Sequence, residues 1–267
     1  MGLREAFVDR VVSRLDRPIQ VKLHWRARVR AGNLHARVMS ELVARGDSAI
    51  DIGANWGIYT IGLSELVGPD GHVIAVEPGP ELVTLQAACA RSANVEIYPL
   101  ALSDRSGMGH LLVPDTSHAS ASALAHIGDR GRADERSIDV RLARLDDLEI
   151  PSPSRLTFIK CDVEGHEDAV LRGGQERIRE CMPALLIEIE ERHRARPVSE
   201  VFQLLSSWGY LGFALTATGL RQLKQFDVDR DQRRHLVNGQ LPVPTPIGYI
   251  NDFLFVRPGG RLPSGVG

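Results

Sequence analysis

The chain has 267 residues and a mass of 29.4 kDa, with 43% hydrophobic residues and a formal net charge of −2. This size and apolar content predict one large α/β domain, or one domain with an appendage. The charge gives no indication of a nucleic-acid partner, and no apolar run approaches the length of a membrane span. Three cysteines without paired spacing, and no recognisable secretory signal, favour reduced thiols in the cytoplasm.

Residues 1–45 are predicted to form a helical cap ahead of the main domain. Apolar residues at helical spacing predict one helix that ends near Pro18 and a second that begins near Asn33. The link between them is rich in arginine and contains Trp25. This link either reaches over a ligand pocket or is solvated charge with Trp25 packed beneath it, and we favour the second interpretation.

The stretch from Ala49 to Thr60 has the pattern of a buried strand, a glycine turn and a helix start. Gly53 and Gly57 bracket the turn, where glycine allows the backbone to approach a ligand closely. A second predicted strand, 72–76, leads to Glu77, which lies 20 residues after Gly57 (77 − 57 = 20). At that distance a strand-end carboxylate can hold a ribose. The third glycine of a dinucleotide site and a P-loop lysine are both missing, so a nucleoside without phosphates fits better.

Three motifs in this order resemble those of the FkbM family of S-adenosylmethionine-dependent methyltransferases. They are Asp51-Ile-Gly-Ala-Asn-Trp-Gly-Ile-Tyr-Thr, Glu77-Pro-Gly-Pro and Lys160-Cys-Asp-Val-Glu-Gly-His-Glu. The resemblance implies a Rossmann-like class I methyltransferase fold, with a seven-stranded, mostly parallel α/β sheet, an antiparallel terminal strand and helices on both faces. The expected domains are the helical cap (1–45), the S-adenosylmethionine-binding domain (46–258) and a C-terminal tail (259–267).

The remaining chain alternates strand and helix patterns, as a parallel sheet requires. Strands are predicted at 95–102, 110–113, 138–142, 156–161, 184–190, 210–215 and 251–256, and helices at 80–91 and 198–208. The strand at 138–142 is expected at a sheet edge, and the last two strands are expected to pair antiparallel. A helix after His166 should break at Gly173-Gly174. The segments 116–136 and 225–246 are predicted to be loops, the first a mobile flap near the acceptor site.

Polar residues gather where the predicted strands end, which indicates a cleft because unpaired carboxylates are costly to bury. For S-adenosylmethionine, Glu77 is expected to accept hydrogen bonds from the ribose hydroxyls. Asp51 and Asp162 would stabilise the cationic ammonium and sulfonium groups, and the turn would receive the carboxylate end. Asp104 either accepts from the adenine amino group or makes a turn. The predicted cofactor-binding set is Asp51, Gly53, Asn55, Gly57, Tyr59, Thr60, Glu77, Ser103, Asp104 and Asp162.

The predicted catalytic residues are Asp162 and His166. A hydroxyl acceptor must lose its proton during methyl transfer, and His166 has a suitable unperturbed pKa for accepting it. Asp162 would position the acceptor or the cationic end of the cofactor. Glu164, Glu188 and His118 are predicted to contact the substrate, although Glu164 fits a helix cap better and a loop histidine such as His118 is often only solvated. No metal is predicted; an oxygen-rich site at Asp162, Glu164 and His166 is the minority alternative.

These observations predict an O-methyltransferase that acts on a hydroxyl of a small or glycosylated metabolite. The family resemblance implies sugars or polyketide-type natural products as acceptors. One alternative is a nucleotide-cofactor oxidoreductase, against which the missing third glycine argues. Another is a non-catalytic cofactor-binding subunit, against which the intact motif residues argue. The expected partner is a small hydroxyl-bearing molecule, and the sequence leaves the oligomeric state open, with a homodimer as one option.

Overall fold

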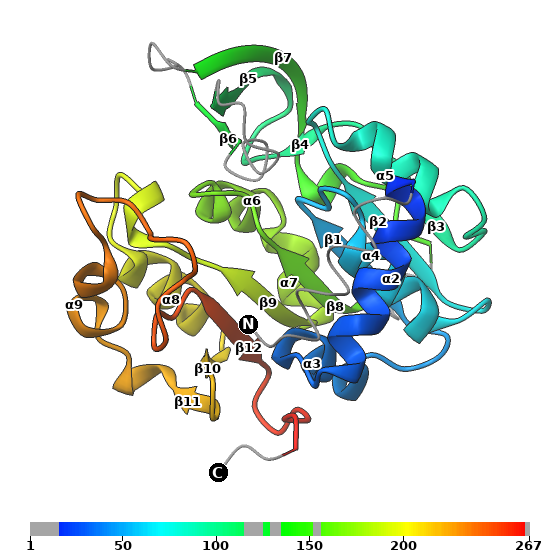
Figure 1. Cartoon of the computed structure of the whole chain (residues 1–267). Coiled ribbons are helices and arrows are strands. Elements are labelled where there is room, and N and C mark those ends of the chain that lie inside the picture. Colours follow the sequence, from blue (N-terminus) through cyan, green and yellow to red (C-terminus); the bar gives the residue numbers. More distant parts are fainter. Residues whose placement is uncertain (1–15, 115–124, 129–134, 152–155, 265–267) are drawn as a thin grey trace.

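The computed structural model describes residues 16–114, 125–128, 135–151 and 156–264. Its main sheet has eight strands in the order β11-β10-β12-β9-β8-β1-β2-β3 (Figure 1). These strands are β1 (Ser48–Ile52), β2 (His72–Val76), β3 (Val95–Tyr98), β8 (Leu156–Cys161), β9 (Ala184–Glu188), β10 (Leu211–Thr216), β11 (Gly219–Gln222) and β12 (Asp252–Val256).

Seven of these strands form the predicted mostly parallel sheet, which confirms the fold class. Strands β1, β2, β3, β8 and β9 are parallel to one another, whereas β12 runs antiparallel between β9 and β10. The antiparallel pairing of β10 with β12 is as predicted. The eighth strand, β11, was not predicted; it folds back on β10 at the edge of the sheet.

The chain leaves β1 for β2 on one side, and β8 later pairs with β1 on the other side. This reversal of strand order is the topological switch point at which open α/β sheets bind ligands, outside the carboxyl ends of the strands. Every residue of β1 is buried, as expected for a central parallel strand that is covered on both faces.

Helices cover both faces of the main sheet. One face carries α2 (Arg17–Arg30), α3 (Leu34–Leu42), α4 (Ile58–Val67) and α5 (Leu82–Cys89). The other face carries α6 (Glu167–Gly173), α7 (Gln175–Cys181) and α8 (Val198–Ser207). Alternate residues of β1 divide between the two cores: Ala49 packs in the first and Ile50 in the second, because successive side chains of a strand point to opposite faces. The predicted break at Gly173-Gly174 separates α6 from α7.

The arginine-rich link predicted between two N-terminal helices is itself a helix, α2. Pro18 lies in its first turn, where proline is well tolerated. Trp25 is only 3% exposed and donates from Nε1 to Glu65 at 3.1 Å, which confirms its packed position. Helix α3 begins after Asn33 as predicted, and the Asn33 side chain accepts from the Ala36 N–H. The helix predicted within residues 1–15 lies outside the described residues.

A second, four-stranded sheet has the order β4-β7-β5-β6 and stands at the top of Figure 1. Its strands are β4 (Ala101–Leu102), β5 (Gly107–Pro114), β6 (His126–Ile127) and β7 (Glu135–Ala143). The single strand predicted at 95–102 is therefore divided between two sheets as β3 and β4. The prediction of an edge strand at 138–142 is wrong, because β7 pairs with both β4 and β5. Its outward Asp139 and Arg141 mark a solvated face of this sheet instead.

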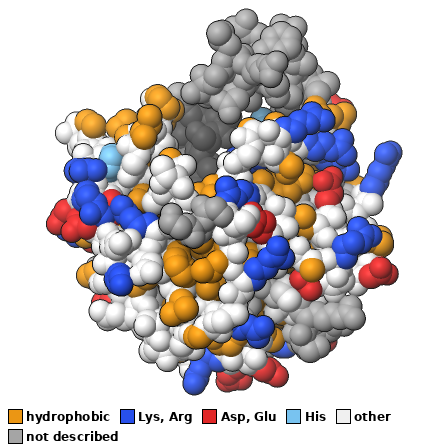
Figure 2. Space-filling model, turned by 90° about the horizontal axis from the view of Figure 1, so that it is seen from below, with side chains coloured by type: hydrophobic (Ala, Val, Ile, Leu, Met, Phe, Trp, Pro, Cys, Tyr) orange, Lys and Arg blue, Asp and Glu red, His pale blue; other side chains and the backbone are white. Residues whose placement is uncertain are grey.

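Short helical turns occupy several connections. They are η2 (Leu145–Asp147), η4 (Glu191–His193), η5 (Leu223–Gln225), α9 (Val228–Asp231) and η6 (Arg233–His235); the last two lie within the predicted loop 225–246. Figure 2, viewed from below, shows acidic and basic side chains interspersed around apolar patches on this face. Among the described residues, no helix combines the length and apolar character needed to cross a membrane.

Candidate active site

A cavity of about 280 Å³ lies at the carboxyl ends of β1, β2 and β8, between the main sheet and the second sheet. This volume is near the lower end of the range for small-molecule sites. Seven of the predicted site residues line it: Gly53, Asn55, Glu77, Asp162, Glu164, His166 and Glu188. The apolar part of the lining includes Ile52, Val76, Leu100, Leu102, Leu111 and Ile127.

Glu77 follows β2 and reaches the cavity with only 7% of its surface exposed. Its Oε2 accepts a hydrogen bond from the backbone N–H of Asn55 at 2.8 Å, and its Oε1 accepts from Gly79 at 2.6 Å. Burial raises the pKa of the Glu77 carboxyl to about 7, despite these two donors. Each carboxylate oxygen retains acceptor capacity for a further donor, so the side chain is a fixed acceptor.

Two glycines of the turn after β1, Gly53 and Gly57, are packed against other parts of the chain. Gly53 has φ +74°, and a Cβ atom there would lie 1.9 Å from the carbonyl oxygen of Asp162. Gly57 has φ +89°, and a Cβ atom there would lie 2.6 Å from Leu85 of α5. The sequence predicted that these glycines let the backbone approach a ligand. In the structure, the space beside each glycine is instead filled by another part of the chain.

Asp51 is fully buried beneath the cavity and is not part of its lining. Its Oδ2 accepts from the Thr60 hydroxyl of α4 at 2.6 Å. Its Oδ1 has no hydrogen-bond partner among the described residues, and burial raises the pKa of the carboxyl. Lys160 lies close enough to oppose that rise, so Asp51 belongs to the buried polar group behind the cavity.

The Lys160 ammonium interacts with both Asp51, behind the cavity, and Asp162, which lines it. Only 5% of Lys160 is exposed, and its Nζ lies 3.0 Å from Oδ2 of Asp162 and 4.8 Å from the ring centre of Tyr59. The Asp162 and Asp51 carboxylates raise the pKa of the Lys160 ammonium against the opposing effect of its burial. Lys160 therefore stays charged, and it fixes Asp162 at the cavity wall.

His166 lies at the start of α6 and faces the cavity. Its Nε2 is 3.0 Å from Oγ of Ser103, and the Ser103 hydroxyl donates to Oδ1 of Asp104 at 3.2 Å. Burial lowers the pKa of the His166 imidazole below its usual 6.5. At neutral pH His166 is therefore uncharged and able to accept a proton.

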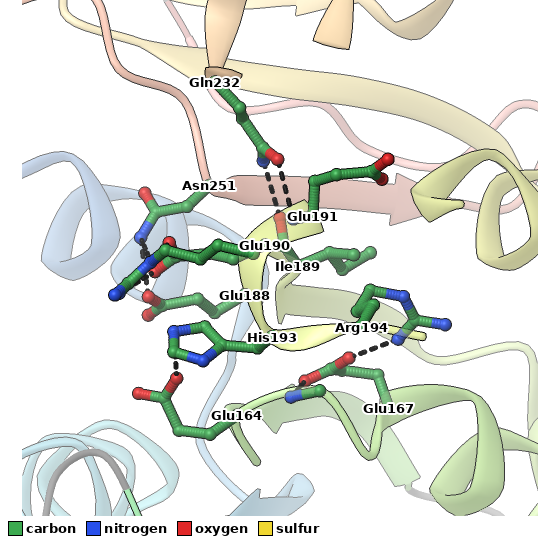
Figure 3. A network of polar contacts seen from close by, with 12 residues as sticks. Glu164, Glu167, Glu188, Ile189, Glu190, Glu191, His193, Arg194, Gln232 and Asn251 are labelled. Atoms are coloured by element: carbon green, nitrogen blue, oxygen red, sulfur yellow. Dashed lines mark hydrogen bonds and ion pairs between the residues drawn. The ribbon is translucent and has the colours of Figure 1, made fainter. Parts of the chain in front are cut away.

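Several carboxylates gather next to β9 (Figure 3), and two of them, Glu164 and Glu188, line the cavity there. Glu188 accepts from Asn251 at 2.6 Å, and Oε2 of Glu164 lies 3.0 Å from Nε2 of His193. Burial, with the neighbouring Asp162, raises the pKa values of both Glu164 and Glu188 well above the usual range. Glu190 is only 4% exposed and is paired with Arg192.

Six predicted residues do not line the cavity. Asp51, Gly57 and Thr60 lie behind it, and Ser103 and Asp104 contact it through His166. Tyr59 points away, since its hydroxyl lies 2.7 Å from Nδ1 of His35 in a network that continues to Asp252. His118 lies outside the described residues.

Two site residues were missed as functional candidates from the sequence: Lys160 and His193. Lys160 lies in the apolar run 156–161, and a buried lysine requires a carboxylate partner. This pattern could have identified Lys160 from the sequence. Nothing in the sequence placed His193 opposite Glu164, 29 positions away (193 − 164 = 29). His126, which belongs to the segment 116–136 predicted as a flap, lines the cavity from β6.

The strand order and the cavity at the topological switch point are those of the class I S-adenosylmethionine-dependent methyltransferase fold. A family model, the Methyltransferase FkbM domain, matches residues 51–211, more than half of the chain. The chain therefore belongs to the FkbM methyltransferase family. Membership of this family argues against the alternative of a nucleotide-cofactor oxidoreductase.

Solved structures share this fold at low sequence identity. The methyltransferase FkbM from Methylobacillus flagellatus KT has a TM-score of 0.51 and 18% identity, over 94% of this chain and 59% of that one. The chain thus spans less than two thirds of that protein. A SAM-dependent methyltransferase from Aquifex aeolicus gives 0.39 and 16%, over 80% and 83%. A SAM-dependent O-methyltransferase from Thermotoga maritima gives 0.42 and 12%, over 86% and 65%. No protein with a curated description matches the chain.

Proposed function

We propose that this chain transfers a methyl group from S-adenosylmethionine to a hydroxyl of a small or glycosylated metabolite. The observation that carries the proposal is the Glu77 carboxylate at the end of β2, which is fixed by the Asn55 and Gly79 N–H groups and faces the cavity. Such a fixed acceptor suits a pair of ribose hydroxyls.

The other lining residues fit the remaining parts of the same cofactor. Apolar side chains of Val76, Leu100 and Leu102 offer a surface for the adenine ring. Asp162, oriented by Lys160, provides a carboxylate for the cationic sulfonium or ammonium group. S-adenosylmethionine, when bound, supplies an activated methyl group, and the protein supplies alignment and a dry site.

His166 is the proposed general base. Its imidazole is uncharged at neutral pH because burial lowers its pKa, and its ring is held by the Ser103 hydroxyl at 3.0 Å. It can therefore accept the proton of an acceptor hydroxyl as the new carbon–oxygen bond forms. Asp162 keeps the acceptor and the cofactor in line.

The carboxyl groups of Glu164 and Glu188 suit an acceptor with several hydroxyls. Both line the cavity on the β9 side, and their carboxyl oxygens can accept hydrogen bonds from several hydroxyls. A sugar or a polyhydroxylated natural product offers the matching set of donors.

Ligand binding and turnover test this function in two steps. S-adenosylhomocysteine should raise the melting temperature, since a ligand at 100 times its Kd stabilises the fold by about 2.7 kcal/mol, whereas NAD should not. Incubation with S-adenosylmethionine and a panel of hydroxylated acceptors should then yield a methyl ether. A shift without turnover on any acceptor would indicate a binding subunit, and no shift at all would contradict the cofactor assignment.

A further inference from the structure

A cluster of three potential metal ligands adjoins the cavity. Glu164 follows β8, Glu190 follows β9 and His193 belongs to η4, and one ligand atom of each lies within 4.8 Å of the other two. Figure 3 shows these side chains converging from three segments of the chain. We propose that Glu164, Glu190 and His193 bind a divalent cation with the preferences of Mn²⁺.

The spacing suits one ion. Carboxylate oxygens and imidazole nitrogens bind such ions at about 2.0–2.2 Å, which places the ligand atoms of one ion about 3–4 Å apart. Oε2 of Glu164 and Nε2 of His193 are already 3.0 Å apart. The Nε2 atom is buried and has no hydrogen-bond partner of good geometry in the described part of the chain. That nitrogen is therefore available as a ligand.

The local charge also favours a cation. Four carboxylates gather here, those of Asp162, Glu164, Glu188 and Glu190, and two of them have a basic partner: Asp162 pairs with Lys160 and Glu190 with Arg192. Neither Glu164 nor Glu188 forms an ion pair with a lysine or arginine within the described ranges. Ionised, the group carries two uncompensated negative charges in a buried setting, which is costly without a counter-ion. A divalent cation balances that charge.

The surrounding residues hold the ligands in place. Arg192 donates to both oxygens of Glu190, Tyr249 donates to Oε2, and Asn251 donates to the neighbouring Glu188. Such outer hydrogen bonds orient the ligating carboxylates in metal sites. The adjacent Arg192 charge also opposes a cation, so we expect moderate affinity.

The two loops that carry Glu164 and His193 are packed directly on each other. Glu164 has φ +51°, and Gly165 has φ +96° with no room for a Cβ atom, which would lie 2.3 Å from the His193 carbonyl oxygen. Glu167 ties the loops together, because Oε1 accepts from Gly165 N–H at 2.7 Å and Oε2 accepts from Arg194 at 2.6 Å. This packing fixes the backbone of Glu164 and His193 relative to each other.

The ion would adjoin the reaction site, because Glu164 lines the cavity beside Asp162. A cation there would bind an acceptor oxygen and lower the pKa of its hydroxyl. This role rests on the proposed function, whereas the binding of the ion does not.

Mn²⁺ binding to the full chain, without cofactor or acceptor, tests the site by electron paramagnetic resonance. We expect one saturable Mn²⁺ per chain, with hyperfine coupling to a histidine nitrogen. His193→Ala should remove that coupling, and His193→Ala and Glu164→Gln should each weaken binding at least about tenfold. His110→Ala is the matched control, since His110 is exposed on β5 and paired with Asp139.

Three results would overturn the proposal: no saturable binding of Mn²⁺, Mg²⁺ or Zn²⁺, no nitrogen coupling in the wild-type protein, or unchanged affinity in both variants. Melting curves without metal establish whether the variants are folded. If the variants are unfolded, the presence or absence of nitrogen coupling in the wild-type protein decides whether a histidine binds Mn²⁺. S-adenosylhomocysteine binding, measured on the same samples, separates a failure of this site from a failure of the proposed function.

Discussion

The backbone N–H of Asn55 donates a 2.8 Å hydrogen bond to Oε2 of Glu77, which joins the turn after β1 to the end of β2 across 22 positions. Because Gly79 donates to the other oxygen at 2.6 Å, the carboxylate cannot rotate freely. The two motifs that are separate in the sequence therefore form one wall of the cavity. The first two predictions follow from this arrangement.

Replacing Glu77 with glutamine should weaken cofactor binding while the fold persists. The amide has one acceptor oxygen in place of two, and a charge-assisted hydrogen bond contributes about 1.5–3 kcal/mol. Glu77→Gln should therefore bind S-adenosylhomocysteine about 10- to 100-fold more weakly by calorimetry. Glu96→Gln is the control, since Glu96 is a half-exposed residue of β3. Equal affinity in Glu77→Gln and wild type would remove Glu77 from the site.

Cofactor affinity should depend on pH through Glu77. Burial raises the pKa of this carboxyl to about 7, and ribose hydroxyls that donate to it favour the ionised form. S-adenosylhomocysteine affinity should therefore rise about tenfold between roughly pH 6 and 8, with proton release on binding. Calorimetry in buffers of different ionisation enthalpy measures both effects. The same rise in Glu77→Gln would assign the titration to another group.

Replacing His166 with alanine should lower turnover much more than cofactor affinity. A general base contributes about 10²–10⁴-fold to rate, and no other role is proposed for this imidazole. Single-turnover rates and S-adenosylhomocysteine titrations, measured side by side, separate the two effects. Ser103→Ala should have a smaller effect on rate, since it removes only the hydrogen bond that orients the ring. Full activity in His166→Ala would mean that the proton leaves by another route.

Gly53→Ala should destabilise the protein more than Gly32→Ala. Both glycines have φ near +70°, a conformation that costs an L-residue about 1–2 kcal/mol. Only Gly53 also faces backbone, since a Cβ atom there would lie 1.9 Å from the Asp162 carbonyl oxygen, whereas nothing lies within 4 Å at Gly32. Urea denaturation should show an additional loss of about 1–3 kcal/mol for Gly53→Ala. Equal losses would show that the chain relaxes around the added methyl group.

The sequence was sufficient for the central strand–turn–helix, for Glu77 at a strand end and for the placement of Asp162 and His166 near it, because each depends on a local pattern. It did not predict which of the motif side chains point into the cavity. Asp51 alternates with Ile50 and Ile52 along β1, so it points to the α4 face and bonds Thr60, away from the cavity. Tyr59 likewise turns towards His35.

By itself, the order of apolar runs, glycines and strand-end acids determined the alternation of strands and helices, since this follows from local periodicity and turn geometry. The family followed from the resemblance of three motifs. Only the tertiary structure decided that Lys160 holds Asp162 and that Glu164 meets His193. Contacts of this kind depend on strand order, register and the packing of loops onto one another, and no short stretch of sequence contains that information.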